Sequence, residues 1–128
     1  RWFVMLSLTG GIRVFVCTQP ADMRRSFDGL FGMVENIVQQ DPLSGFLFVF
    51  RNRNRDRLKI LFWDTDGFVI WYKRLEEGTW QLPTDMKTQS DGEVSAEIST
   101  EELSLLLGGI DLRSVERRRR YQRSKKTR

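Results

Sequence analysis

The stretch that decides the fold is residues 45–75, which read GFLFVFRNRNRDRLKILFWDTDGFVIWYKRL. Three apolar runs, at 46–50, 58–63 and 68–72, are rich in aromatic and β-branched residues. Runs of this length, bounded by turn residues, are typical of strands rather than helices. The second turn is the sequence DTDG at 64–67, where aspartate closes local hydrogen bonds and glycine tolerates positive φ. The stretch therefore predicts three consecutive strands joined by two tight turns.

The first of these turns carries a dense positive cluster. Its basic residues recur at every second position and are Arg51, Arg53, Arg55, Arg57 and Lys59. In one continuous strand all five would share a face, but a turn must fall among them, so we expect them to fan out around a hairpin tip. Positive charge beside aromatic strands is typical of nucleic-acid binding. Arginines also keep a hairpin tip soluble and protect an edge strand, and the residues alone leave both interpretations open.

Composition indicates one folded domain without histidine chemistry. The chain has 128 residues, of which 40% are hydrophobic and 12% aromatic, which suits a buried core. No stretch approaches the ~20 apolar residues of a transmembrane helix. The opening segment lacks a signal-peptide cleavage site, and Met5 is a candidate for the natural start. Because Cys17 is the only cysteine and histidine is absent, we expect a cytoplasmic protein without disulfides, histidine-based catalysis or histidine-containing zinc sites.

Charge divides the chain into a domain and a tail. Residues 85–112 carry a net charge of −6, and residues 113–128 carry +8. Such asymmetry suggests a polyanionic partner. We therefore expect a single domain over 1–112 and a flexible basic tail over 113–128.

The flanking segments predict two helices and further strands. A strand at 12–17, with Cys17 as a small buried hydrophobe, precedes a helix of about four turns that Asp22 would cap. Ser99 and Glu102 have the spacing of a capping box and predict a second helix that ends at Gly108-Gly109. Two more strands, the second weakly alternating, are expected at 79–82 and 94–98.

Two groups of side chains are candidates for chemistry or contact. Asp64 and Asp66 are the best metal candidates, but a site of that kind needs a third carboxylate, and Asp-x-Asp-Gly is also ordinary turn sequence. Trp63 and Trp71 are close enough along the hairpin to be cross-strand neighbours. If both helices cover one face of the sheet, the other face is left as an aromatic interaction surface.

Several separate motifs resemble one known family. They are Ala21 to Leu30, Asp41 to Gly45, Leu47 to Phe50, Asp56 to Lys59, Trp63 to Gly67, Tyr72 to Leu75 and Leu105 to Asp111. Together they resemble TnpB, the family of small accessory proteins of bacterial insertion sequences of family sixty-six, which is unrelated to the RNA-guided nuclease of that name. The chain departs from the family pattern at Phe46, where many members have histidine, and at Arg55, near a family glycine.

The resemblance implies a protein that is encoded beside a separate DDE-type transposase and is needed for transposition of its element. It carries over no catalytic residues, and we expect no enzyme activity, metal or cofactor. The partners implied are DNA, at the element ends or without sequence preference, and the DDE-type transposase.

We predict an α+β domain with a mainly antiparallel, aromatic-rich sheet of about five strands and two packed helices. It would bind DNA through the hairpin and the tail. The alternative is an adaptor that docks the transposase through the aromatic sheet face. The expected DNA contacts are Arg24, Arg25, Arg51, Arg53, Arg55, Arg57, Lys59, Lys73, Arg74, Arg117, Arg118, Arg119, Arg120 and Arg123.

Overall fold

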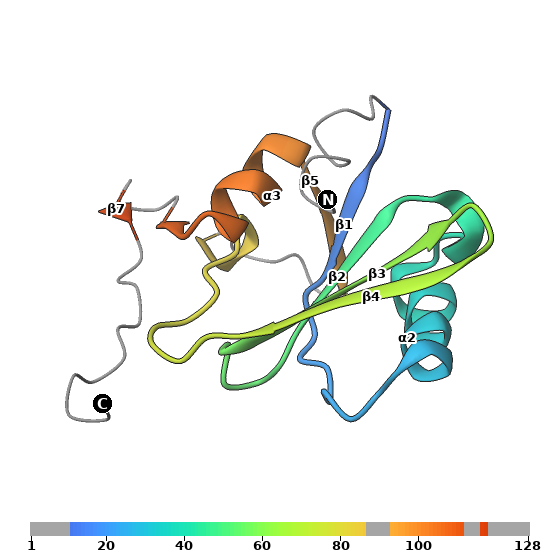
Figure 1. The fold of residues 1–128 in the computed structure, drawn as a ribbon, viewed down its shortest axis with the longest axis horizontal. Coiled ribbons are helices and arrows are strands. Elements are labelled where there is room, and N and C mark those ends of the chain that lie inside the picture. The colour runs from blue at the N-terminus through green and yellow to red at the C-terminus, as the bar shows by residue number, and fades with distance from the viewer. Residues whose placement is uncertain (1–10, 87–92, 112–115, 118–128) are drawn as a thin grey trace, which may run out of the picture.

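A five-stranded sheet forms the centre of the molecule (Figure 1). The structure is a computed structural model that describes residues 11–86, 93–111 and 116–117. The strand order is β4-β3-β2-β1-β5. The strands are β1 (Val14–Cys17), β2 (Leu47–Arg51), β3 (Arg57–Asp64), β4 (Gly67–Arg74) and β5 (Ser95–Ile98).

The three-strand stretch at 45–75 folds as the sequence predicts. β3 pairs antiparallel with both β2 and β4. β1 joins the free side of β2 in parallel, and β5 then pairs antiparallel with β1. The sheet is therefore mainly antiparallel, and with its two helices it confirms the predicted α+β class.

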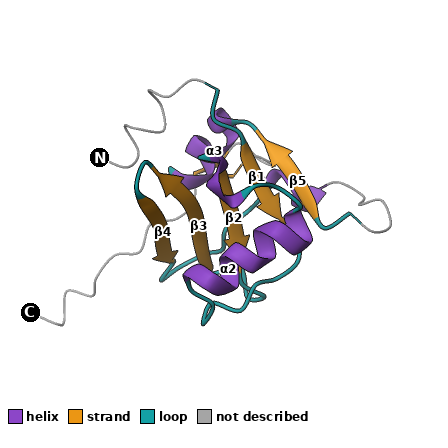
Figure 2. Cartoon of the chain, turned by 90° about the vertical axis from the view of Figure 1, so that its right-hand side faces the viewer, coloured by secondary structure: helices purple, strands orange, loops and turns teal. Residues whose placement is uncertain are grey.

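The two helices cover opposite faces of the sheet, which corrects the prediction of one bare aromatic face. Figure 2 shows α2 (Phe27–Met33) in front of the sheet and α3 (Thr100–Leu107) behind it. One core forms between α2 and one face of the sheet, where Leu30 packs with Phe48 and Phe50. The other forms between α3 and the opposite face. Alternate residues of each strand point to opposite faces, so strands that are apolar at every position need cover on both sides.

The first helix begins later than predicted, and Asp22 is not its cap. α2 starts at Phe27 after Ser26, and a π-helix, η1 (Val34–Val38), continues it. The Asp22 carboxylate instead accepts hydrogen bonds from the backbone N–H and the guanidinium of Arg24. Segment 22–26 therefore remains a loop.

The predicted strand at 79–82 is wrong. Trp80 and Leu82 are fully buried in the core on the α3 side, but the segment is irregular and leads into a 3₁₀ helix, η3 (Pro83–Met86). The backbone N–H of Trp80 donates to the Arg55 carbonyl rather than to a strand neighbour (2.7 Å). Segment 79–82 therefore fills the core without joining the sheet.

The predicted tryptophan pair is also wrong, because the register of the hairpin separates its members. Trp63 lies opposite Phe68, with ring centroids 5.1 Å apart. Trp71 lies opposite Ile60 and packs edge-on against Trp80, with centroids 6.2 Å apart. The two indoles point to opposite faces of the sheet.

The second helix matches its prediction. Ser99 caps α3 by accepting from the Glu102 backbone N–H at 3.0 Å, and the Glu102 carboxylate accepts from the Ser99 N–H at 2.9 Å. Beyond α3, the short strands β6 (Ile110–Asp111) and β7 (Glu116–Arg117) pair antiparallel. Two of the expected tail residues thus form a strand, while residues 118–128 lie outside the described residues. A further 3₁₀ helix, η2 (Pro42–Ser44), precedes β2.

Candidate nucleic-acid interface

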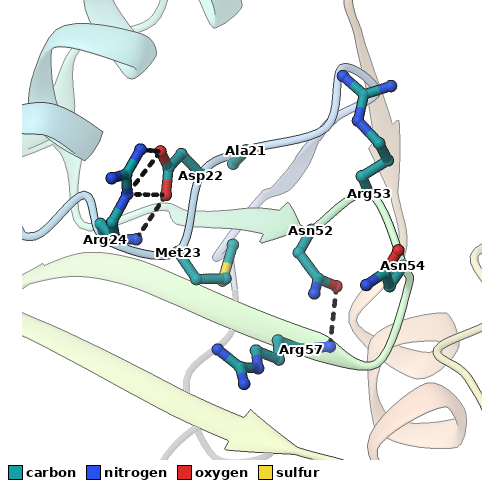
Figure 3. Close-up of a pocket in the computed structure, with 8 residues that line it drawn as sticks. All are labelled: Ala21, Asp22, Met23, Arg24, Asn52, Arg53, Asn54 and Arg57. Carbon is teal, nitrogen blue, oxygen red and sulfur yellow. Dashed lines mark hydrogen bonds and ion pairs between the residues drawn. The ribbon is translucent and has the colours of Figure 1, made fainter.

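Two segments that are distant in sequence meet at one end of the sheet. Because β1 and β2 are parallel, the loop after β1 and the turn after β2 leave the sheet at the same end. The backbone N–H of Ala21 donates to the Arg51 carbonyl at 2.9 Å and holds the two segments together. An open hollow of about 380 Å³ lies between them (Figure 3). Its lining residues are Ala21, Asp22, Met23, Arg24, Asn52, Arg53, Asn54 and Arg57.

Asn52 builds the turn that carries the arginines. Its side-chain amide donates to the Asp56 carboxylate at 2.7 Å, and its Oδ1 accepts from the Arg57 backbone N–H at 3.0 Å. Its carbonyl accepts from the Arg55 N–H at 3.1 Å, and Arg55 has a φ of 64°. Left-handed backbone is uncommon outside glycine. The hydrogen bonds of Asn52 hold Arg55, and with it the turn, in this conformation. The tip is therefore a defined structure.

Lys59 supports the opposite wall of the hollow from inside the protein. Its side chain is buried, and Nζ donates to the carbonyl oxygens of Met23 and Arg25 at 2.8 and 2.7 Å. The ammonium also lies 4.7 Å from the centroid of the Tyr72 ring. Burial lowers the pKa of Lys59, partly opposed by the charge of Asp22. We therefore reassign Lys59 from a phosphate contact to an anchor of loop 22–26, because its charge is not at the surface.

Arg51 is likewise reassigned to the interior. Its guanidinium forms a bidentate pair with Asp85 at 2.7 and 2.8 Å and also donates to the Trp80 carbonyl at 2.8 Å. Only 11% of the Arg51 side chain and 7% of the Asp85 side chain are exposed. Burial opposes ionisation of Asp85, but hydrogen bonds from Arg51 and from the Leu82 N–H outweigh it and lower the pKa of the carboxyl. The pair ties the start of the arginine turn to segment 80–85.

The remaining arginines of the turn face solvent and the hollow. Among the described residues, the guanidiniums of Arg53 and Arg57 have no hydrogen-bond or ion-pair partner. Arg55 is 48% exposed and lies 3.8 Å from an Asp85 oxygen. The sequence predicts DNA contacts at all five basic residues of the turn, and the structure places three of them at the surface and two in the interior.

Loop 22–26 adds a third cation to the hollow, beside Arg53 and Arg57. The Arg24 side chain is 92% exposed and pairs with Asp22 at 2.7 Å. This hydrogen bond from Arg24 is the main reason that the pKa of Asp22 falls to about 2. Figure 3 shows the Asp22–Arg24 pair on one wall and Arg53 and Arg57 on the other. Arg25 is exposed on the same loop but does not line the hollow.

The other predicted contacts lie on β4 or near the C-terminus. Arg74 faces Arg57 across the β3–β4 pair and bonds to Glu76 at 2.8 Å. The Lys73 ammonium lies 5.9 Å from the Trp80 ring centroid. Arg117 belongs to β7, and Arg118, Arg119, Arg120 and Arg123 lie outside the described residues.

Sequence reasoning missed the polar residues that frame the arginines. Asn54 lines the hollow beside Arg53. Thr18 and Gln19 line a second, smaller space of about 100 Å³, which shares Asn52 and Arg53 with the first. The alternation of asparagine and arginine at 51–55 was the available signal, since asparagine is a turn-forming residue whose amide bonds to nearby backbone.

The described residues contain no cluster of three or more potential metal ligands. Asp64 and Asp66 lie in the β3–β4 turn at the opposite end of these strands from Arg57 and Arg74. Cys17 is buried, as expected, and burial raises the pKa of its thiol. Across the same described residues, no helix is long and apolar enough to cross a bilayer.

The chain is similar in sequence to known proteins. The sequence profile of the family described as IS66 Orf2 like protein matches residues 12–117. The chain belongs to the IS66 Orf2-like family. It is similar to two uncharacterized proteins of Sinorhizobium fredii. The chain is 38% identical to y4jC over 89% of its own length and 92% of that protein. It is 38% identical to y4hO over 85% of its own length and 90% of that protein.

No solved structure matches the chain. Family membership confirms the resemblance that the motifs indicate, and this IS66 Orf2-like protein therefore functions in insertion-sequence transposition as an accessory protein. The matched region begins two residues before β1 and includes both walls of the basic hollow.

Proposed function

We propose that this IS66 Orf2-like protein binds DNA through the basic hollow and the arginine tip beside it. The observation that carries the proposal is the gathering of Arg24, Arg53 and Arg57 around one open space of about 380 Å³. Two of these guanidiniums have no partner among the described residues. Phosphate groups accept paired hydrogen bonds from guanidinium, and cationic clusters of this kind attract polyanions.

The buried contacts behind the hollow hold its two walls in place. Lys59 fixes the loop that carries Arg24, and the Arg51–Asp85 pair fixes the strand end that carries Arg53. A charge held in place loses less conformational entropy on binding than a charge on a mobile chain. The backbone segments that carry the surface arginines are therefore positioned before DNA arrives.

The chemistry of the hollow favours binding over catalysis. It offers guanidinium and amide donors, while its one carboxylate, Asp22, is occupied by Arg24. Donors of this kind position a phosphate backbone and carry no information about base sequence. We therefore assign the hollow a role in holding DNA during transposition, independent of base sequence.

The test is fluorescence anisotropy with a labelled DNA duplex, comparing Arg53→Gln with Arg13→Gln. Both arginines are exposed and each substitution removes one positive charge, but Arg13 pairs with Glu97 at the opposite end of β1. To reduce the contribution of the tail, both substitutions are made in a full-length background with glutamine at Arg117 to Arg120 and at Arg123, which are five of its nine basic residues.

We expect Arg53→Gln to weaken binding about ten-fold, the loss of one charge-assisted hydrogen bond, and Arg13→Gln to leave it nearly unchanged. Equal loss in the two variants would show that only net charge matters and would contradict the proposed site. A duplex with a scrambled sequence should bind as tightly as one that carries the element end.

A further inference from the structure

The outer edge of β4 is long, apolar and open. β4 has eight residues and is the last strand of the sheet, and among the described residues only β3 pairs with it (Figure 2). Five consecutive residues, 68–72, are aromatic or aliphatic, and Tyr72 is 47% exposed. Proteins usually protect such an edge with charges, proline, bulges or short strands. None of these devices interrupts residues 68–72.

The opposite edge of the sheet shows the contrast. β5 has only four residues, and the exposed Glu97 on it pairs with Arg13 at 2.7 Å. A short and charged strand is a poor template for further pairing. Of the two edges of the sheet, the β4 edge is therefore the one that is suited to pairing with another strand.

The charges at the two ends of β4 are opposite in sign. Asp66 directly precedes its first residue, with Asp64 at the end of β3 beside it, and Lys73 and Arg74 are its last two residues. When two copies of such a strand lie antiparallel, the acidic end of each meets the basic end of the other. We propose that two copies of the chain pair antiparallel through β4 and form a symmetric dimer with one continuous sheet.

The hydrogen-bonding pattern of the hairpin gives the register of this pairing. Asp64 and Gly67 close a two-residue turn, and the residues that close such a turn are hydrogen-bonded to each other. Counting in alternation from Gly67, the backbone groups of Phe68, Ile70 and Tyr72 point away from β3.

Centring the pair on Ile70 then satisfies both backbone and side chains. Ile70 lies opposite Ile70 of the second copy, and Tyr72 lies opposite Phe68, an aromatic pair that stabilises antiparallel strands. In the same register Arg74 lies opposite Asp66 of the second copy. The apolar centre and the charged ends therefore match simultaneously.

The dimer would place the two arginine tips far apart. Each tip adjoins the Arg74 end of its own β4, since Arg57 lies opposite Arg74. In an antiparallel pair these ends point in opposite directions, and eight residues of strand span about 27 Å. If the basic hollow binds DNA as proposed above, one dimer holds two DNA segments. The dimer itself does not depend on that function.

The first test measures the mass of the full chain in solution by sedimentation equilibrium over a range of concentrations. We expect a mass of about twice the 15.1 kDa of one chain. Arg74→Glu and Asp66→Lys should each raise the dimer dissociation constant about ten-fold, because two symmetry-related attractions become repulsions. The double variant should restore it. A chain that stays monomeric, or a dimer that neither substitution weakens, overturns the proposal.

The second test reads the register directly by disulfide formation under mild oxidation. Cysteine at Ile70 would face its own copy about 5.5 Å away between Cα atoms, which suits a disulfide. Cysteine at Phe68 would lie about 14 Å from its own copy. We expect Ile70→Cys to give a covalent dimer and Phe68→Cys to give none. The native Cys17 is buried and does not interfere. Cross-linking at Phe68 but not at Ile70 would overturn the proposed pairing.

Discussion

Replacing Arg51 with methionine tests the division of the arginine cluster into buried and exposed members. The Arg51 guanidinium makes three hydrogen bonds, two to Asp85 and one to the Trp80 carbonyl. With Arg51→Met the Asp85 carboxylate stays buried and keeps the Leu82 N–H, with Arg55 at 3.8 Å. Removing one partner of a buried ion pair costs about 3–5 kcal/mol. For a chain of 128 residues this predicts a fall in melting temperature of about 11–19 °C.

The assay is urea and thermal unfolding followed by circular dichroism, with two controls. Arg53→Met changes an exposed residue of the same turn and should alter stability by less than about 0.5 kcal/mol. The double variant Arg51→Met/Asp85→Leu removes both charges and should recover most of the loss, because an apolar pair of similar volume can replace a buried ion pair. A loss below about 1 kcal/mol in Arg51→Met, or a double variant no more stable than the single, would refute the reasoning.

Three further predictions concern the loop and the second helix. Lys59→Met should destabilise the fold by about 2 kcal/mol, because two carbonyls lose a charged donor. It should also weaken DNA binding, although Lys59 itself touches no DNA. DNA binding equal to that of the unaltered chain would contradict the role of Lys59 as an anchor. Carbon-detected NMR should show Asp22 titrating at about pH 2 and near its ordinary value in Arg24→Gln. Because the folded pKa is lowered, the stabilisation from this pair is complete above about pH 4 and is lost as pH falls through about 2. Ser99→Ala should cost about 1 kcal/mol in urea unfolding through the lost capping box, and a neutral result would mean that α3 is held by packing alone.

The sequence predicts the local elements of this fold well where one pattern dominates. The apolar runs at 45–75 identify three strands, and the spacing of Ser99 and Glu102 identifies the start of α3. Both signals are local, because turn chemistry and side-chain capping act within a few residues. The sequence also indicates that the hairpin tip is basic, which the structure shows at Arg53 and Arg55.

The arrangement of the candidate site could not be predicted, because it depends on contacts between distant segments. Lys59 has the same spacing as the arginines, yet its partners Met23 and Arg25 lie more than thirty residues earlier in the chain. The same contact explains why the helix begins at Phe27 and not near Asp22. Arg51 is similar, since its partner Asp85 lies 34 residues away in a segment without periodicity. Alternation along a strand indicates which residues share a face of the sheet. It does not indicate which of those residues are covered by other segments of the chain.

The measurement that tests the account most directly is the salt dependence of DNA binding. The protein is the full chain with glutamine at Arg117 to Arg120 and at Arg123, with and without Arg53→Gln/Arg55→Gln/Arg57→Gln. Each phosphate contact contributes about −0.9 to the slope of log K against log salt concentration. We predict that the triple variant flattens this slope by about 2–3 units. If the slope is the same in both proteins, the arginine tip does not bind DNA, and the central claim is wrong.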